Sequence, residues 1–191
     1  MTERAILYDT TKCSACRACQ VACKQWNELP AVRTRKFGGP GLQNPADLSA
    51  NSWVFIEFRQ AAGHDRDAEG NWNFLRRACM HCTDAPCKET CDSLYDKARP
   101  AKFAAIKQSA EGFIWVDYKR CFPQPAKSGG CGGACRQACP FAVPRVGKVD
   151  ANGDGVPERL TMRKRRGCID RLASGLTPAC VKACGPEALQ F

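Results

Sequence analysis

Residues 13–23 read CSACRACQVAC, in which four cysteines stand in the spacing C-x2-C-x2-C-x3-C. Thiolate sulfur is the ligand that iron takes in cubane iron–sulfur clusters, and this spacing is one of the runs that hold them. Cysteine is frequent along the whole chain: fifteen of its 191 residues are cysteines, and they fall into four groups. The first group therefore predicts a fold organised around iron–sulfur clusters.

The other three groups vary the spacing of the first. The second group has the spacing C-x2-C-x4-C-x3-C and consists of Cys79, Cys82, Cys87 and Cys91. The third is stretched, ends in Cys-Pro, and consists of Cys121, Cys131, Cys135 and Cys139. The fourth is one thiolate short of a full set and consists of Cys168, Cys180 and Cys184.

The order of the groups along the chain predicts the domain organisation. In a dicluster ferredoxin arrangement, the first three cysteines of a run bind one cluster and the fourth binds the other cluster. Groups one and four then form an outer unit, and groups two and three form a unit inserted within it. We therefore expect a loop-rich α+β fold of two nested bacterial-ferredoxin-like dicluster units. The outer unit comprises residues 1–30 and 145–191, the inserted unit 79–144, and a connector with short strands 31–78.

Local patterns predict a few short elements between the ligands. Each x3 step between cysteines suits a helical turn, and we expect helices at 19–26 and 135–139, the second ended by Pro140. Aromatic and β-branched residues predict strands at 52–59 and 112–118. Residues 150–155 predict a turn between two short extended pieces.

Composition and charge exclude several other classes of protein. A disulfide scaffold requires an even cysteine count and a secreted chain, and structural zinc requires separated CxxC pairs. The formal net charge of +10 falls near neutrality once four clusters, each contributing about −2 with its thiolates, are included. No basic stretch carries the stacking aromatics of a nucleic-acid binder. No run of 18 apolar residues and no signal region is present, so we expect a soluble protein that does not itself span a membrane.

The chain resembles the four-cluster iron–sulfur (beta) electron-transfer subunits that accompany molybdenum or tungsten bis-pterin oxidoreductases. The resemblance rests on the stretches KCSACRACQVACKQWNELP, RACMHCTDAPCKETC, CRQACPFAVPR and CIDRLASGLTPACVKACGPEAL. Within this family, ACKQWNELP followed by LQNPADLS is most similar to the small subunit of formate dehydrogenases.

The resemblance implies four sites that together use each cysteine once. Site one takes Cys13, Cys16, Cys19 and Cys184, and site two takes Cys23, Cys168 and Cys180. Site three takes Cys79, Cys82, Cys87 and Cys139, and site four takes Cys91, Cys121, Cys131 and Cys135. Sites one, three and four are expected to hold [4Fe–4S] clusters.

Two departures from the family pattern concern ligands. Arg165 stands where group four should have its first cysteine, and an arginine side chain does not ligate iron. Site two is therefore expected to hold either a [3Fe–4S] cluster or a four-iron cluster with a non-cysteine fourth ligand. The segment FPQPAKSGG at 122–130 is an insertion between Cys121 and the rest of group three.

Two further features have more than one interpretation. His81 lies inside Cys79-Met-His-Cys82 and is either a ligand or, more in keeping with its neighbours, a side chain that points away. The basic run at 163–166 is a docking patch, a charge that raises the potential of site two, or a solvated face. The sequence alone leaves these interpretations open.

The resemblance implies a function without substrate chemistry. No Ser/His/Asp set, phosphate loop or hydrolase motif is present, so the expected role is non-catalytic electron transfer. The expected partners are a large molybdenum or tungsten bis-pterin catalytic subunit, with formate dehydrogenase as the first expectation, and a further electron-carrier subunit. The alternatives are a subunit of an aldehyde oxidoreductase or other Mo/W reductase, and a free polyferredoxin. The expected location is cytoplasmic, or periplasmic if the chain is exported with a partner.

Overall fold

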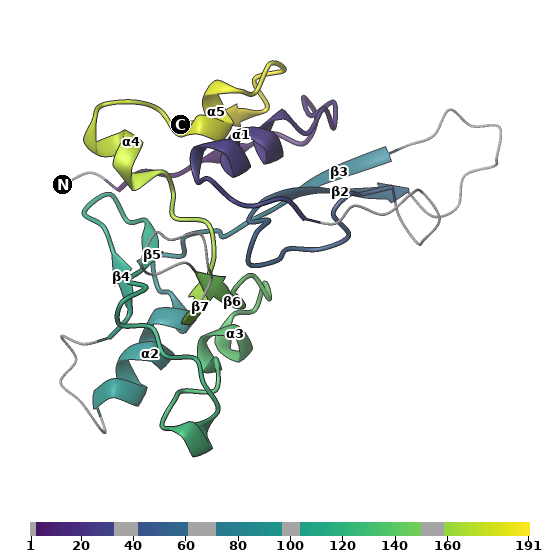
Figure 1. Cartoon of the computed structure of the whole chain (residues 1–191). Helices are drawn as coiled ribbons and strands as arrows, with labels where there is room; N and C mark the ends of the chain where they lie inside the picture. Colours follow the sequence, from purple (N-terminus) through teal and green to yellow (C-terminus); the bar gives the residue numbers. More distant parts are fainter. Residues whose placement is uncertain (1–2, 33–41, 61–71, 97–103, 150–158) are drawn as a thin grey trace. The chain divides into compact units, whose positions relative to one another are not determined.

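The computed structural model describes residues 3–32, 42–60, 72–96, 104–149 and 159–191 (Figure 1). Its contacts divide the chain into two compact units, each made of separate segments of the chain. Unit 1 comprises Met1–Ala5 and Cys79–Asp170, and unit 2 comprises Ile6–Ala78 and Arg171–Phe191. Each unit is described by itself below.

Unit 2 combines two helices with two small sheets. Helix α1 (Ala18–Trp26) packs against α5 (Ala179–Lys182). Strand β1 (Leu7–Tyr8) pairs antiparallel with β8 (Leu189–Gln190), which joins the two ends of the unit. Strand β2 (Phe55–Gln60) pairs antiparallel with β3 (Trp72–Arg77), with Phe55 opposite Arg77.

The core of unit 2 gathers around α1 and the start of β2. It consists of buried apolar side chains from both sequence segments of the unit, including Cys19, Cys23, Leu29, Trp53, Val54, Ile56, Ala78, Cys180 and Leu189. Leu29 follows α1, and Trp53 donates its indole N–H to the Ala50 carbonyl at 2.7 Å. Cys19, Cys23 and Cys180 belong to this core, so side chains that the sequence predicts as iron ligands are also part of the packed interior.

Unit 1 also combines short helices with paired strands. Its helices are α2 (Pro86–Asp96) and α3 (Ala134–Ala138), which pack against each other, together with the 3-10 turn η2 (Ala126–Ser128). Its strand pairs are β4 (Ile106–Gln108) with β5 (Ile114–Val116), and β6 (Arg145–Val149) with β7 (Arg159–Arg163). Helix α4 (Ile169–Ala173) lies where the chain passes from unit 1 to unit 2.

Several sequence predictions are confirmed. The predicted α+β, loop-rich class is correct, and the predicted helices at 19–26 and 135–139 are α1 and α3 within one residue. The two extended pieces around the predicted turn are β6 and β7, while the turn itself at 150–155 lies outside the described residues.

The strand predicted at 52–59 begins only at Phe55, because Ser52 instead forms an isolated bridge with Ser49. The strand predicted at 112–118 is the shorter β5.

None of the helices in the described ranges has the length and apolar character needed to cross a lipid bilayer.

Candidate iron–sulfur centres

One cavity in unit 1 is lined by four cysteines from groups two and three. They are Cys79, Cys82, Cys87 and Cys139, and the cavity has about 370 Å³ of space not filled by atoms, counting its open side. Cys79 and Cys82 precede α2, Cys87 lies in its first turn, and Cys139 ends α3. Apolar residues such as Ala85, Val143 and Ile114 line the rest of the wall, together with Lys164.

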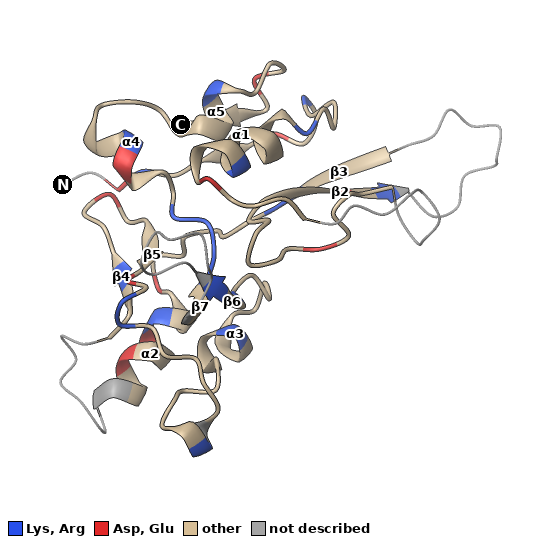
Figure 2. Ribbon diagram, in the orientation of Figure 1, with Lys and Arg blue, Asp and Glu red and all other residues tan. Residues whose placement is uncertain are grey.

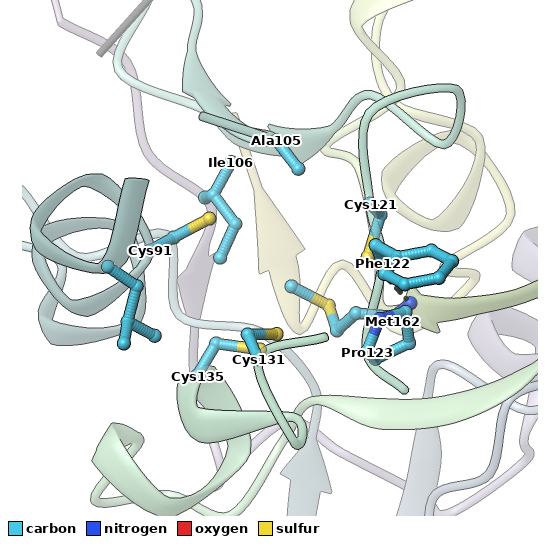
Figure 3. A pocket seen from close by; sticks show the side chains of 10 residues that line it. Cys91, Ala105, Ile106, Cys121, Phe122, Pro123, Cys131, Cys135 and Met162 are labelled. Carbon is cyan, nitrogen blue, oxygen red and sulfur yellow. Dashed lines mark hydrogen bonds between the residues drawn. The ribbon is translucent and has the colours of Figure 1, made fainter. Parts of the chain in front are cut away.

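A second cavity in unit 1 is lined by four other cysteines from the same two groups. They are Cys91, Cys121, Cys131 and Cys135, around about 360 Å³ of space counted in the same way. Figure 3 shows these four side chains around one space, with Met162 among them. The third and fourth cysteines of group two, Cys87 and Cys91, both lie on α2, and each lines a different one of the two cavities.

Unit 2 brings together cysteines from groups one and four. Cys19 and Cys23 on α1 and Cys180 on α5 are buried in one core, and Cys184 packs against it. Cys13 and Cys16 act electrostatically on Cys19, so they also lie near it. Cys168 falls within unit 1, two residues before that unit ends, and its position relative to Cys23 and Cys180 is not described.

The loops that carry the cysteines share a backbone pattern. Ala15 and His81 each stand just before the second cysteine of a C-x2-C step, and both have a positive φ, 55° and 54°. Ala142 and Glu187 each stand three residues after a cysteine, Cys139 and Cys184, with φ of 49° and 55°. Residues in this left-handed region turn the chain sharply. The same turns therefore wrap the chain around the ligands in both units.

Burial, followed by the charge of neighbouring thiols, makes the thiols of these sites hard to ionise. Together they raise the pKa of Cys19 to about 11, of Cys87 to about 11 and of Cys135 to about 12. Nearby cations oppose this effect, since Arg76 lowers the pKa of Cys19 and Lys164 lowers that of Cys87. Because thiolate is the form that binds metal, iron in the cavity would supply the main compensating charge.

Hydrogen-bond donors approach several of the sulfurs. In unit 1 the Met162 N–H donates to Cys121 Sγ at 3.2 Å, and Lys164 Nζ donates to Cys79 Sγ at 3.4 Å. In unit 2 Arg76 Nη2 donates to Cys180 Sγ at 3.5 Å. Sulfur atoms that carry negative charge are stabilised by such donors, as are cluster ligands.

The basic run at 163–166 has a different environment from a surface patch. Lys164 is 1% exposed and Arg165 is 4% exposed, so neither belongs to a solvated face or a docking surface. Arg165 Nη1 donates to the Cys79 carbonyl at 3.2 Å, and Lys164 also contacts Cys79. The run is the blue segment between β7 and α4 in Figure 2. Both side chains therefore contact Cys79, which the sequence assigns to site three.

His81 makes a structural contact. Its Nδ1 accepts a hydrogen bond from the Ile114 N–H at 3.0 Å, and its ring packs edge-on against Phe113 with centroids 5.1 Å apart. This agrees with the interpretation in which the side chain points away from the ligands.

Lys164 and Arg76 had not been predicted as individual site residues, because their contacts join residues 85 and 104 positions apart.

The chemistry of the donors fits iron–sulfur clusters. Each unit 1 cavity presents four thiols around a volume, and thiolate is the ligand that such clusters use. Within the described part of the chain, no three His, Cys, Asp or Glu side chains meet closely enough to hold a single metal ion. The sulfurs stand around a space instead, as the ligands of a multi-iron cluster must.

Comparison with known proteins agrees with this donor set. The 4Fe–4S dicluster domain family matches residues 70–191 of the chain. The formate dehydrogenase-O iron-sulfur subunit of Escherichia coli is 35% identical over 99% of this chain and 53% of its own length. The formate dehydrogenase subunit beta of Megalodesulfovibrio gigas is 34% identical over 99% of this chain and 76% of its own length. The formate dehydrogenase 2 subunit beta (cytochrome c-553) of Nitratidesulfovibrio vulgaris is 34% identical over 98% of this chain and 75% of its own length.

These matches define an iron–sulfur protein of the dicluster class. The chain belongs to the 4Fe–4S dicluster family, together with the iron–sulfur subunits named above. It spans about half the length of the Escherichia coli relative, so that protein's activity and partners are not transferred to it directly.

Proposed function

We propose that this chain is the electron-transfer subunit of a formate dehydrogenase. In this proposal it binds a large catalytic subunit that carries molybdenum or tungsten, and it conducts electrons from that subunit to an acceptor, for which a further electron-carrier subunit is a candidate. The observation that carries the proposal is the pair of cavities in unit 1, each lined by four thiols. The relatives that are formate dehydrogenase iron–sulfur subunits supply the choice of partner.

The proposed ligands are the four sets that use each cysteine once. Site one comprises Cys13, Cys16, Cys19 and Cys184, site two Cys23, Cys168 and Cys180, site three Cys79, Cys82, Cys87 and Cys139, and site four Cys91, Cys121, Cys131 and Cys135. The lining of the two cavities in unit 1 supports sites three and four. The shared core of Cys19, Cys23, Cys180 and Cys184 supports the unit 2 members of sites one and two, while Cys168 of site two belongs to unit 1.

The proposed cofactors are four clusters, of which sites one, three and four hold [4Fe–4S]. Site two, with three thiolates, holds either a [3Fe–4S] cluster or a four-iron cluster with a non-cysteine ligand. Grouped by ligands, the dicluster units are 1–30 with 145–191, and 79–144. This grouping follows the ligand sets and differs from the units defined by contacts, in which 145–170 packs with 79–144.

The residues of this chain do three things in the proposed role. When bound, iron–sulfur clusters supply centres that gain and lose single electrons at little structural change. The cysteines fix the positions of these centres, and apolar residues such as Ile106 and Met162 keep water from them. Donors such as Arg76 and the Met162 N–H stabilise negative charge on the sulfurs.

Anaerobic affinity purification of the tagged chain from its host tests the proposal. We expect a large subunit to co-purify, with molybdenum or tungsten bound to it, and about 15 to 16 iron atoms per copy of this chain. The complex should oxidise formate. A large partner that oxidises aldehydes instead would identify the alternative enzyme, and a stable monomer with all its iron would identify a free polyferredoxin.

A further inference from the structure

Lys164 is a buried cation at the edge of the cavity of Cys79, Cys82, Cys87 and Cys139. It is 1% exposed and lines that cavity. Its Nζ lies 3.4 Å from Cys79 Sγ and 3.1 Å from the Arg165 carbonyl oxygen, and it also donates to the Ile114 carbonyl. These three acceptors match the three N–H donors of an ammonium group.

The described residues place no carboxylate in a salt bridge with the positive charge of Lys164. A buried ammonium without a counter-charge is costly, and the anionic groups beside this one are the thiolates of the cavity. The positive charge of Lys164 therefore acts on whatever those thiolates hold.

Among the described residues that line the neighbouring cavity of unit 1, none is charged. Its described lining consists of cysteines and the apolar residues Leu94, Ala105, Ile106, Phe122, Pro123 and Met162. The donors at its sulfurs include the Met162 N–H on Cys121 Sγ and the backbone N–H groups of Ala105 and Ile106 on Cys91, which are dipoles and not full charges. Arg163 lies over the Tyr118 ring and is not among the residues that line this cavity.

We propose that Lys164 is a positioning residue that raises the reduction potential of the cluster held by Cys79, Cys82, Cys87 and Cys139 above that of the cluster in the neighbouring cavity. This inference rests on the proposed cluster ligands. Reduction adds one electron to the site and no proton, so the site becomes one charge more negative. A fixed cation next to Cys79 stabilises that reduced state more than the oxidised state. Electrons entering unit 1 therefore settle on the cluster beside Lys164.

The test is a redox titration of the anaerobic holoprotein followed by EPR, with dithionite as reductant. The Cys82→Ser variant identifies the signal of this cluster, because that signal changes in it. In the wild type we expect this cluster to have the higher potential of the two in unit 1. In Lys164→Met we expect its equilibrium constant for reduction to fall at least tenfold, which is about 59 mV for one electron, with the other potentials unchanged.

Three further variants separate charge from structure. Lys164→Gln keeps a donor and loses the charge, so it should lower the potential as Lys164→Met does. Lys164→Arg keeps the charge and should stay close to the wild-type potential. Lys148→Met, at an exposed lysine of the same unit, should change nothing. If Lys164→Met proves too unstable to titrate, Lys164→Gln gives the same answer.

The outcomes distinguish this inference from the proposed function. Unchanged potentials in Lys164→Met and Lys164→Gln, with full iron content and both unit 1 clusters visible, would overturn the role of Lys164 alone. A lower wild-type potential for the cluster beside Lys164 would overturn the inferred order. Wild-type protein that shows no [4Fe–4S] signals at all would overturn the cluster assignment itself, and this inference with it.

Discussion

Arg76 on β3 donates a hydrogen bond to the sulfur of Cys180 on α5, with 3.5 Å between Nη2 and Sγ, although 104 positions separate the two residues. The same guanidinium acts on Cys19, whose pKa burial raises and Arg76 lowers. One arginine therefore interacts with thiols from the first and the fourth cysteine groups. These interactions connect the two sequence segments that form unit 2.

Replacing Arg76 by methionine should destabilise unit 2. The loss of a hydrogen bond to a charged sulfur costs about 1.5–3 kcal/mol, and the free energy of unfolding should fall by that amount. Anaerobic urea unfolding, followed by the visible absorbance of the clusters, measures the change. Arg77→Met is the matched control, because the Arg77 side chain is 40% exposed and lies 3.8 Å from Glu57. An equal loss in both variants would mean that the contact with Cys180 contributes nothing.

Replacing Cys87 by serine should remove one cluster and spare the catalytic partner. Cys87 is buried in the wall of one cavity, and its loss leaves three thiols there. In the purified complex we expect about four fewer iron atoms per chain, or about one fewer if the site retains a three-iron cluster. Formate oxidation with an artificial dye should continue, while transfer to the natural acceptor stops. Dye-linked activity that disappears, with docking and the partner's cofactor intact, would contradict the division of labour.

Two alanine-to-glycine changes in unit 1 should have opposite signs. Ala142 has a φ of 49°, and relief of that left-handed conformation should stabilise the protein by roughly 1–2 kcal/mol. Ala134 begins helix α3, where glycine costs roughly 0.5–1 kcal/mol. Urea midpoints of Ala142→Gly and Ala134→Gly provide the comparison. Destabilisation by both would show that the turn after Cys139 carries no backbone strain.

Replacing Arg165 by cysteine should complete site two. The variant creates a C-x2-C step with Cys168, and we expect an all-thiolate four-iron cluster of lower potential than the wild-type site. Mössbauer spectra and EPR titration detect this conversion. Arg166→Cys is the control, because it puts a thiol one residue out of step. An unchanged signal in Arg165→Cys would show that the fourth ligand already comes from elsewhere in the chain.

Removing the iron should unfold both units. The buried core of unit 1 includes Cys87, Cys91, Cys121 and Cys135, and that of unit 2 includes Cys19, Cys23 and Cys180, so the proposed clusters would lie at the centres of the two cores. Metal binding by such ligands is also folding free energy. Anaerobic treatment with a chelator should abolish most far-UV circular dichroism and amide protection. Retention of native protection in the iron-free chain would refute this dependence.

The sequence predicted the helices that are tied to cysteines and the strands that are rich in β-branched and aromatic residues. Helices α1 and α3 follow from cysteines four positions apart, because that step is local. Strand β3 was expected only as one of the short strands of the connector at 31–78, since its sequence ends in Arg76 and Arg77 and its pairing with β2 is what stabilises it. The run at 163–166 looked uniform, yet tertiary packing buries Lys164 and Arg165 against Cys79. Periodicity carries no information about such a contact.

The four two-stranded sheets among the described residues have a consequence for how this protein aggregates when its clusters are lost. Every described strand pairs with one other strand only, so its outer N–H and C=O groups depend on other partners, as where the Ile56 N–H donates to Gln20 and the Met162 N–H to Cys121. The chain limits the hazard by keeping most strands to five residues or fewer, and by placing arginines on the six-residue β3. Once oxygen destroys the clusters and the chain around them loosens, edges that lose such partners can join between molecules. Damage by air should therefore end in aggregation through strand edges and not in a soluble unfolded chain.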